Sequence, residues 1–181
     1  FFSLTNQVSI EASSDDNNSI NYVHLKNTSN NLSTIYSTSY QNKIYNQIAK
    51  LKKYKNYTIE HPLLITNPYG TNTTSVYMYF KTSDELQATY TIHCEGYNDF
   101  SRTLNNNTLS GYTTNHEYLL VGAIPGQINT ITVTLTNKQG NPVDTLSWSY
   151  NAPSLQGGDQ YLTVDCDDAN TSSLSNGLYT V

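Results

Sequence analysis

Cysteine, charge and long apolar runs are all scarce in this chain of 181 residues. Its two cysteines, Cys94 and Cys166, allow a single intramolecular disulfide and exclude a disulfide-rich scaffold. Charged residues make up only 13% of the chain, about half the usual share. No run of about 18 apolar residues occurs, so we expect no membrane insertion.

Positive charge is especially limited, with 9 basic against 14 acidic side chains and a net charge of -5. Four of the basic residues cluster at Lys50, Lys52, Lys53 and Lys55. One such cluster does not form the basic stripe that neutralises phosphates, which argues against nucleic acid as a partner. We interpret the cluster as the solvated end of a helix, with a patch for an anionic surface as the alternative.

Uncharged polar and aromatic side chains take the place of charge. Asn, Thr, Ser and Gln together account for 74 of the 181 residues, and 16 Tyr, 4 Phe and 1 Trp supply large side chains for a core. A folded domain is therefore expected. The chain begins at Phe1 without a Met, and no basic segment followed by an apolar stretch stands at its start. We therefore expect a signal peptide to have been removed from a secreted, periplasmic or cell-surface protein.

One amphipathic helix is predicted from about residue 37 to 54. Its apolar stripe, Tyr40, Ile44, Ile48 and Leu51, repeats at spacings of four and three. Ser37 or Ser39 can cap its start. An isolated helix of this length is marginal in water, so we expect the stripe to dock on a sheet, either its own or that of a second copy.

From residue 57 onward the apolar period changes from near four to two. Residues 76–80, 88–94 and 143–150 alternate, and in 130–136 every second residue is threonine. These runs follow one another with turn signals and without intervening helices, which indicates an all-β, antiparallel sandwich. Two further β-like runs, 8–11 and 20–25, belong either to the sandwich or to a loosely attached arm.

A disulfide between Cys94 and Cys166 is predicted, with two separate thiols as the alternative. Cys94 has the parity of Ile92 and should face inward, while Cys166 ends a short strand at 161–166.

Two segments carry a family resemblance. The first, residues 58–70, places a helix exit and a strand before the turn Asn67, Pro68, Tyr69, Gly70. The second, residues 122–130, leads into the threonine-rich strand. This order resembles the N-terminal immunoglobulin-like domain of bacterial arylsulfate sulfotransferases over roughly residues 57–150. Pro68 should bias Asn67 to an extended conformation, and Gly70 should take the positive φ that ends the turn.

The resemblance implies an immunoglobulin-like sandwich that precedes a catalytic β-propeller of the same chain, which transfers a sulfuryl group from a phenolic sulfate ester to a phenol. A homodimer is also consistent with it. The domain prediction is a strand-forming arm at 1–33, the amphipathic helix at 34–56, the immunoglobulin-like sandwich at 57–155, and at 156–181 a linker and the start of the absent propeller. We expect the natural protein to continue beyond Val181.

No catalytic, cofactor or metal site is expected in these residues themselves. His24, His61, His93 and His116 are interpreted as surface or strand histidines without partner spacing. The acidic cluster at 165–168 lacks the glycine and the terminal glutamate of a helix-loop-helix calcium site. The alternative to an accessory sulfotransferase domain is a surface adhesin or carbohydrate-binding sandwich, in which tyrosines stack on sugar rings.

Overall fold

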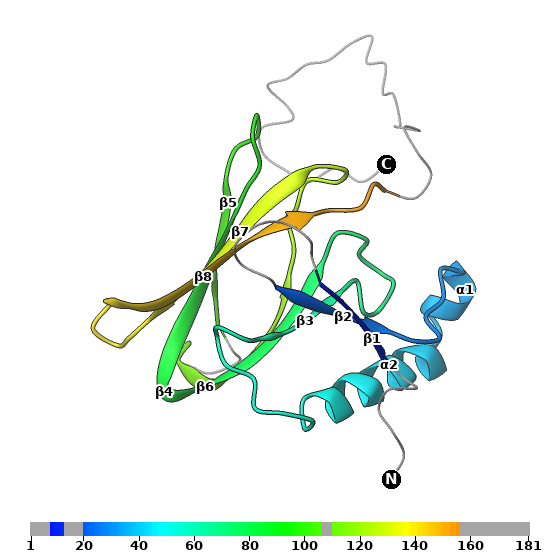
Figure 1. Ribbon diagram of the computed structural model, residues 1–181, viewed down its shortest axis with the longest axis horizontal. Coiled ribbons are helices and arrows are strands. Elements are labelled where there is room, and N and C mark those ends of the chain that lie inside the picture. Colours follow the sequence, from blue (N-terminus) through cyan, green and yellow to red (C-terminus); the bar gives the residue numbers. More distant parts are fainter. Residues whose placement is uncertain (1–7, 13–19, 106–109, 156–181) are drawn as a thin grey trace, which may run out of the picture.

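The computed structural model describes residues 8–12, 20–105 and 110–155 (Figure 1). Along these residues the elements are β1 (Val8–Ala12), β2 (Asn21–Leu25), α1 (Leu32–Ile35), α2 (Thr38–Leu51), β3 (Leu63–Thr66), β4 (Val76–His93), β5 (Phe100–Leu104), β6 (Thr113–Leu120), β7 (Ile128–Thr136) and β8 (Pro142–Asn151). Strands dominate from residue 63 onward, as the change of period predicted.

The long strand β4 belongs to two sheets. Its first half pairs with β3 and β6, and its second half pairs with β5 and β7. Between the halves the register to β6 shifts, between Lys81 and Leu86. Such an irregularity bends and twists a strand, which lets one strand pass from one sheet of a sandwich to the other. The first sheet has the order β1-β2-β3-β4-β6, and the second has the order β5-β4-β7-β8.

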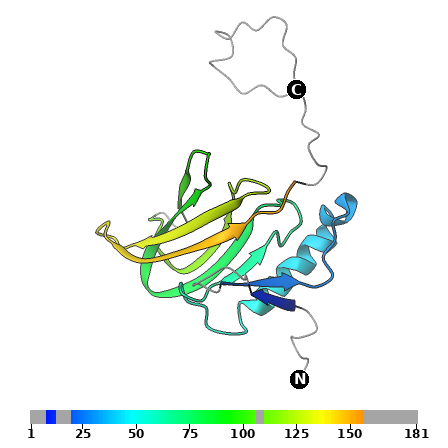
Figure 2. The ribbon, with the colours of Figure 1, turned by 45° about the horizontal axis from the view of Figure 1, so that its top comes forward.

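The second sheet bears out the alternation seen in the sequence. In β7 the buried residues Ile131, Val133 and Leu135 alternate with threonines, and β8 buries Leu146 and Trp148 in the same way. Figure 2 shows the paired strands β7 and β8 on one side of the sandwich. The predicted all-β sandwich with one amphipathic N-terminal helix is confirmed.

Strand β2 departs from the antiparallel pattern. It pairs parallel to β3, with Tyr22 opposite Leu64, and the helical segment forms the connection that a parallel pair needs. Trp148 Nε1 in β8 donates a hydrogen bond of 2.7 Å to the Tyr22 hydroxyl. Residues 20–25 are therefore tied to both sheets, and the predicted boundary at residue 33 falls inside α1.

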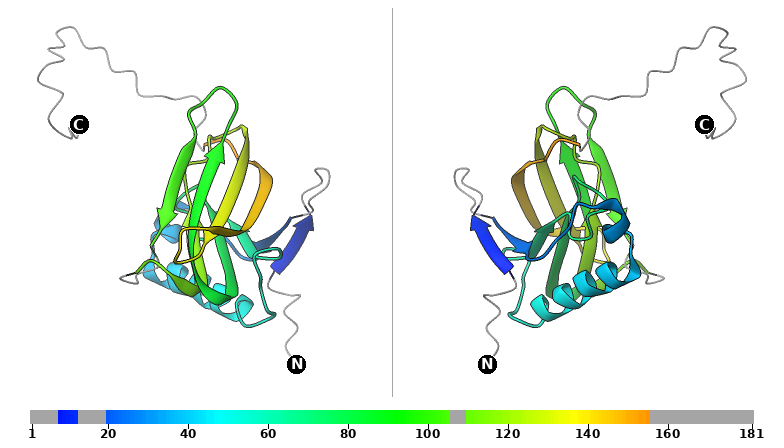
Figure 3. Two further views of the ribbon diagram at one scale, coloured as in Figure 1. Left: turned by 90° about the vertical axis from the view of Figure 1, so that its left-hand side faces the viewer. Right: turned by 90° about the vertical axis from the view of Figure 1, so that its right-hand side faces the viewer.

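Helix α2 covers the outer face of the first sheet. Ser37 caps it by accepting from the Tyr40 backbone N–H, and the helix ends at Leu51, earlier than the predicted residue 54. The four stripe residues Tyr40, Ile44, Ile48 and Leu51 are at most 6% exposed within the single chain. Figure 3 shows α2 lying along this sheet.

The two faces of the first sheet explain why β4 begins with five consecutive buried residues, Val76 to Phe80. Met78 lies opposite Leu64 and Tyr118 in the neighbouring strands, on the face that joins the sandwich core. Tyr77 and Tyr79 alternate to the other face, where the Lys52 ammonium at the end of α2 lies 4.7 Å from the Tyr79 ring centroid. The sheet is thus enclosed between α2 and the second sheet.

Candidate functional site

The Asn-Pro-Tyr-Gly turn joins β3 to β4. Gly70 has the expected positive φ of 75°, and its N–H donates to the Asn67 carbonyl over 3.2 Å. Asn67 is not extended as predicted, because its φ is 39°. The Asn67 side chain accepts from the Asn72 N–H, and its own N–H donates to the Ser75 carbonyl. These local bonds hold it in a left-handed conformation that asparagine tolerates better than most residues.

The turn also anchors the helical segment. The Tyr69 side chain is half-buried against the core, and the Tyr69 carbonyl accepts from Gln41 Nε2 of α2 over 3.1 Å. A Cβ on Gly70 would lie 3.0 Å from the Ile35 side chain in α1. The turn therefore packs within the domain, against α1 and α2.

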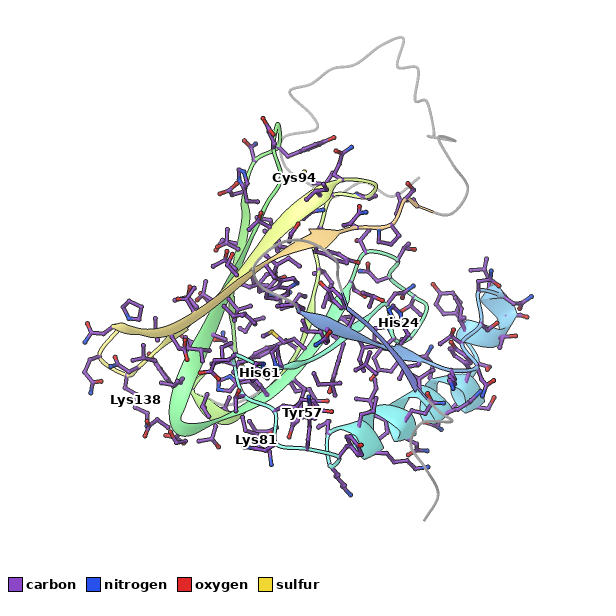
Figure 4. All side chains as sticks on the ribbon, in the orientation of Figure 1. His24, Tyr57, His61, Lys81, Cys94 and Lys138 are labelled. Carbon is purple, nitrogen blue, oxygen red and sulfur yellow. The ribbon has the colours of Figure 1, made fainter. Side chains whose placement is uncertain are left out.

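A cavity of about 180 Å³ adjoins this turn. It is lined by His24, Leu25, Thr28, Ser29, Tyr40, Thr66, Asn67, Pro68 and Gly70. At about 30 Å³ per molecule, the space suits roughly six waters. The described lining residues offer hydroxyl, amide and imidazole groups but no carboxylate. They can form hydrogen bonds to a small polar molecule but provide no His–carboxylate pair for acid–base chemistry. His24 lies beside the turn in Figure 4.

His116 is a fully buried residue of β6. Its ring stacks on Phe80 at a centroid distance of 4.5 Å, Nδ1 lies 2.6 Å from the Tyr118 hydroxyl, and Nε2 lies 3.0 Å from the Thr82 hydroxyl. Burial lowers the pKa of His116 to about 4. The sequence interpretation missed this burial, although His116 has the same parity as Tyr118 and Leu120, which are both buried.

His93 has a partner that the sequence interpretation also missed. Its Nδ1 lies 2.7 Å from Asp99 Oδ1 across the turn between β4 and β5, and both side chains are more than half exposed. The spacing of six residues between His93 and Asp99, across a hairpin, was the feature of the sequence that could have indicated this pair. His61 is exposed on the segment before β3. The structure brings none of these three histidines together with another.

The remaining predicted groups are separated or fall outside the described ranges. Cys94 is buried, as its parity predicted, and its Sγ lies 3.9 Å from the Glu95 carbonyl. Cys166 and the acidic cluster at 165–168 lie outside the described residues, so the disulfide stays a prediction. Among residues 8–12, 20–105 and 110–155, no three His, Cys, Asp or Glu side chains gather as metal ligands.

Comparisons with known proteins identify the sandwich. Residues 63–152, which run from β3 to just after β8, match the family model described as the arylsulfotransferase Ig-like domain. Neither the curated proteins nor the solved structures gave a match. In the part of the chain that is described, no helix is long and apolar enough to cross a membrane. The matched segment contains the Asn-Pro-Tyr-Gly turn and the lead into β7. By this match, residues 63–152 belong to the arylsulfotransferase immunoglobulin-like domain family.

Proposed function

We propose that this chain is the non-catalytic N-terminal part of an arylsulfate sulfotransferase. In this proposal a separate β-propeller of the same protein transfers a sulfuryl group from a phenolic sulfate ester to a phenol, without a nucleotide donor. The family match over residues 63–152 is the observation that carries the proposal. The sandwich orients the propeller or pairs two copies of the protein. The protein as a whole is exported.

The geometry of the histidines supports a non-catalytic role. Sulfuryl transfer requires an accessible nucleophile and donors placed around the developing oxyanion charges. His116 is fully buried, and both of its ring nitrogens already face hydroxyl groups. His93 is paired with Asp99, but the pair stands exposed on a hairpin where water has free access. Neither histidine is placed to form a sulfuryl-enzyme intermediate.

One end of the sandwich offers apolar surface for a neighbouring domain. Ile128 is 66% exposed at the start of β7, and its partner across the ladder is Asn151, where β8 ends. Leu155, four residues later, is 50% exposed, and Phe100 at the start of β5 is 40% exposed. Burial of such side chains against a second domain stabilises their relative orientation.

Activity measurements on two lengths of the protein test the proposal. The uncut protein should transfer sulfate from a chromogenic aryl sulfate to a phenol without a nucleotide donor, and residues 1–181 alone should not. Turnover by residues 1–181 that is lost on changing His24, His61 or His93 would contradict the division of labour. Inactivity of the uncut protein together with saturable binding of a polysaccharide would favour the adhesin or carbohydrate-binding alternative.

A further inference from the structure

Four lysines gather around one open groove between the end of α2 and the first sheet. The groove has a volume of about 610 Å³ and is lined by Ala49, Lys52, Lys53, Lys55, Asn56, Tyr79, Lys81 and Asn115. The Lys81 N–H donates to the Tyr57 carbonyl over 3.0 Å, which fixes the segment after α2 against β4. Figure 4 shows Tyr57 and Lys81 next to each other at this end of the molecule.

The helix dipole does not explain this gathering. Lys50 is the basic residue in the last turn of α2, and Lys52 is its C-cap. Lys53 and Lys55 follow the helix end, while Lys81 comes from the middle of β4. Dipole effects fall off within the last turn, so they give no reason to bring Lys81 to the same place.

The groove is strongly cationic within an acidic protein. It holds four of the nine basic residues of a chain whose net charge is -5, and none of the described residues that line it carries a carboxylate. Lys52 is neutralised by Glu117, whose Oε2 lies 2.5 Å from its Nζ. Among the described residues, Lys53 and Lys81 have no carboxylate within ion-pair distance. Their mutual repulsion is an unfavourable term that a bound anion would remove.

Neighbouring side chains hold two of these cations in place. The Lys52 ammonium lies over the Tyr79 ring, and the Lys55 ammonium lies 5.1 Å from the Tyr57 ring centroid. Fixing a lysine in the unbound protein lowers the entropy cost of ligand binding. The Asn56 and Asn115 side chains add neutral hydrogen-bond donors to the lining.

The size of the groove exceeds that of a single oxyanion. A sulfate ion, comparable to roughly three waters of about 30 Å³ each, fills on the order of a seventh of 610 Å³. The volume lies within the range of about 300 to 1,000 Å³ typical of small-molecule sites. Lysine ammonium groups are point charges that suit sulfate and phosphate oxygens.

From these observations we propose that the groove binds a small polyanion that carries two or more sulfate or phosphate groups. Lys53 and Lys81 supply the unpaired positive charge, Lys52 and Lys55 flank the ligand, and Asn56 and Asn115 donate hydrogen bonds to its oxygens. The inference is independent of the sulfotransferase proposal, because the groove uses none of the histidines and none of the exposed apolar end.

Calorimetric titration of the 181-residue chain at low ionic strength tests the proposal, with tripolyphosphate, a multiply sulfated disaccharide and inorganic sulfate as probes. At least one polyanion should bind about tenfold tighter than inorganic sulfate, and the double change Lys53→Gln and Lys81→Gln should weaken it about tenfold. The control Lys43→Gln and Lys138→Gln removes the same charge from exposed residues outside the groove. Preference for one polyanion identifies phosphate or sulfate as the ligand group.

Several results would overturn the proposal. These are the absence of saturable binding for both polyanions, an equal loss of affinity in the control, and binding of anionic vesicles without binding of either polyanion, which would instead indicate a membrane surface. Amide shifts in the unmodified chain give a second measurement that does not depend on any variant. They should change on titration around Asn56 and Asn115, and changes confined to other regions would contradict the site.

Discussion

Acid should destabilise this domain through one buried side chain. His116 is 0% exposed, its ring stacks on Phe80, and its two nitrogens face the hydroxyls of Tyr118 and Thr82. The folded protein holds this imidazole in its neutral form, because burial lowers its pKa from 6.5 to about 4. Unfolding returns the ring to water, where it accepts a proton readily.

The direction and size of the effect follow from proton linkage. Between pH 6.5 and about 4 the unfolded chain binds a proton at His116 that the folded chain does not, so the free energy of unfolding falls as the pH falls. The stabilisation is fully present above pH 6.5 and is lost once the pH passes below about 4. The lowering of the His116 pKa from 6.5 to about 4 corresponds to about 3 kcal/mol in the free energy of unfolding, at about 1.4 kcal/mol for each pH unit.

Urea unfolding at several pH values measures this loss. His116→Gln loses the ring stack on Phe80, so at neutral pH its free energy of unfolding should be lower than that of the unmodified chain. Because glutamine does not titrate, the difference in the free energy of unfolding between the two proteins should narrow by about 3 kcal/mol at pH 4. His61→Gln, at an exposed position, is the matched control and should keep the pH dependence of the unmodified chain. An NMR titration of the His116 ring gives its pKa directly. A folded-state pKa near 6.5, or identical pH profiles for His116→Gln and the unmodified chain, would refute the reasoning.

Two further predictions concern the helix and the N-terminal strand. Ile44→Asp places a charge at a fully buried position of α2 and should reduce the free energy of unfolding by more than about 4 kcal/mol in chemical denaturation, whereas Asn42→Asp on the exposed face should change it by less than about 0.5 kcal/mol. An equal effect of both changes would show that the apolar stripe does not hold the helix. Tyr22→Phe removes the acceptor of the buried Trp148 Nε1–H and should lower the free energy of unfolding by about 1 to 3 kcal/mol, measured by thermal unfolding. An unchanged melting temperature would show that this hydrogen bond does not hold β2 in place.

Local periodicity was sufficient to identify the elements that have one apolar face. The alternation of threonine with branched apolar residues in 130–136 predicted β7, and the spacing of Tyr40, Ile44, Ile48 and Leu51 predicted α2. Each pattern reports the burial of a single face, which depends only on the geometry of the element itself. The resemblance carried by residues 58–70 and 122–130 also indicated the family that the match over 63–152 shows.

Contacts between residues far apart in the chain decided the rest. Three examples are the parallel pairing of Tyr22 with Leu64, the passage of β4 between two sheets and the approach of Lys81 to the end of α2. In each case the local sequence of one segment does not indicate which other segment it contacts. His116 illustrates the same limit, because an alternating strand does not reveal that its histidine meets Phe80 in a closed core. Charge and hydrogen bonding at these places depend on the distances between atoms, and only the tertiary structure sets those distances.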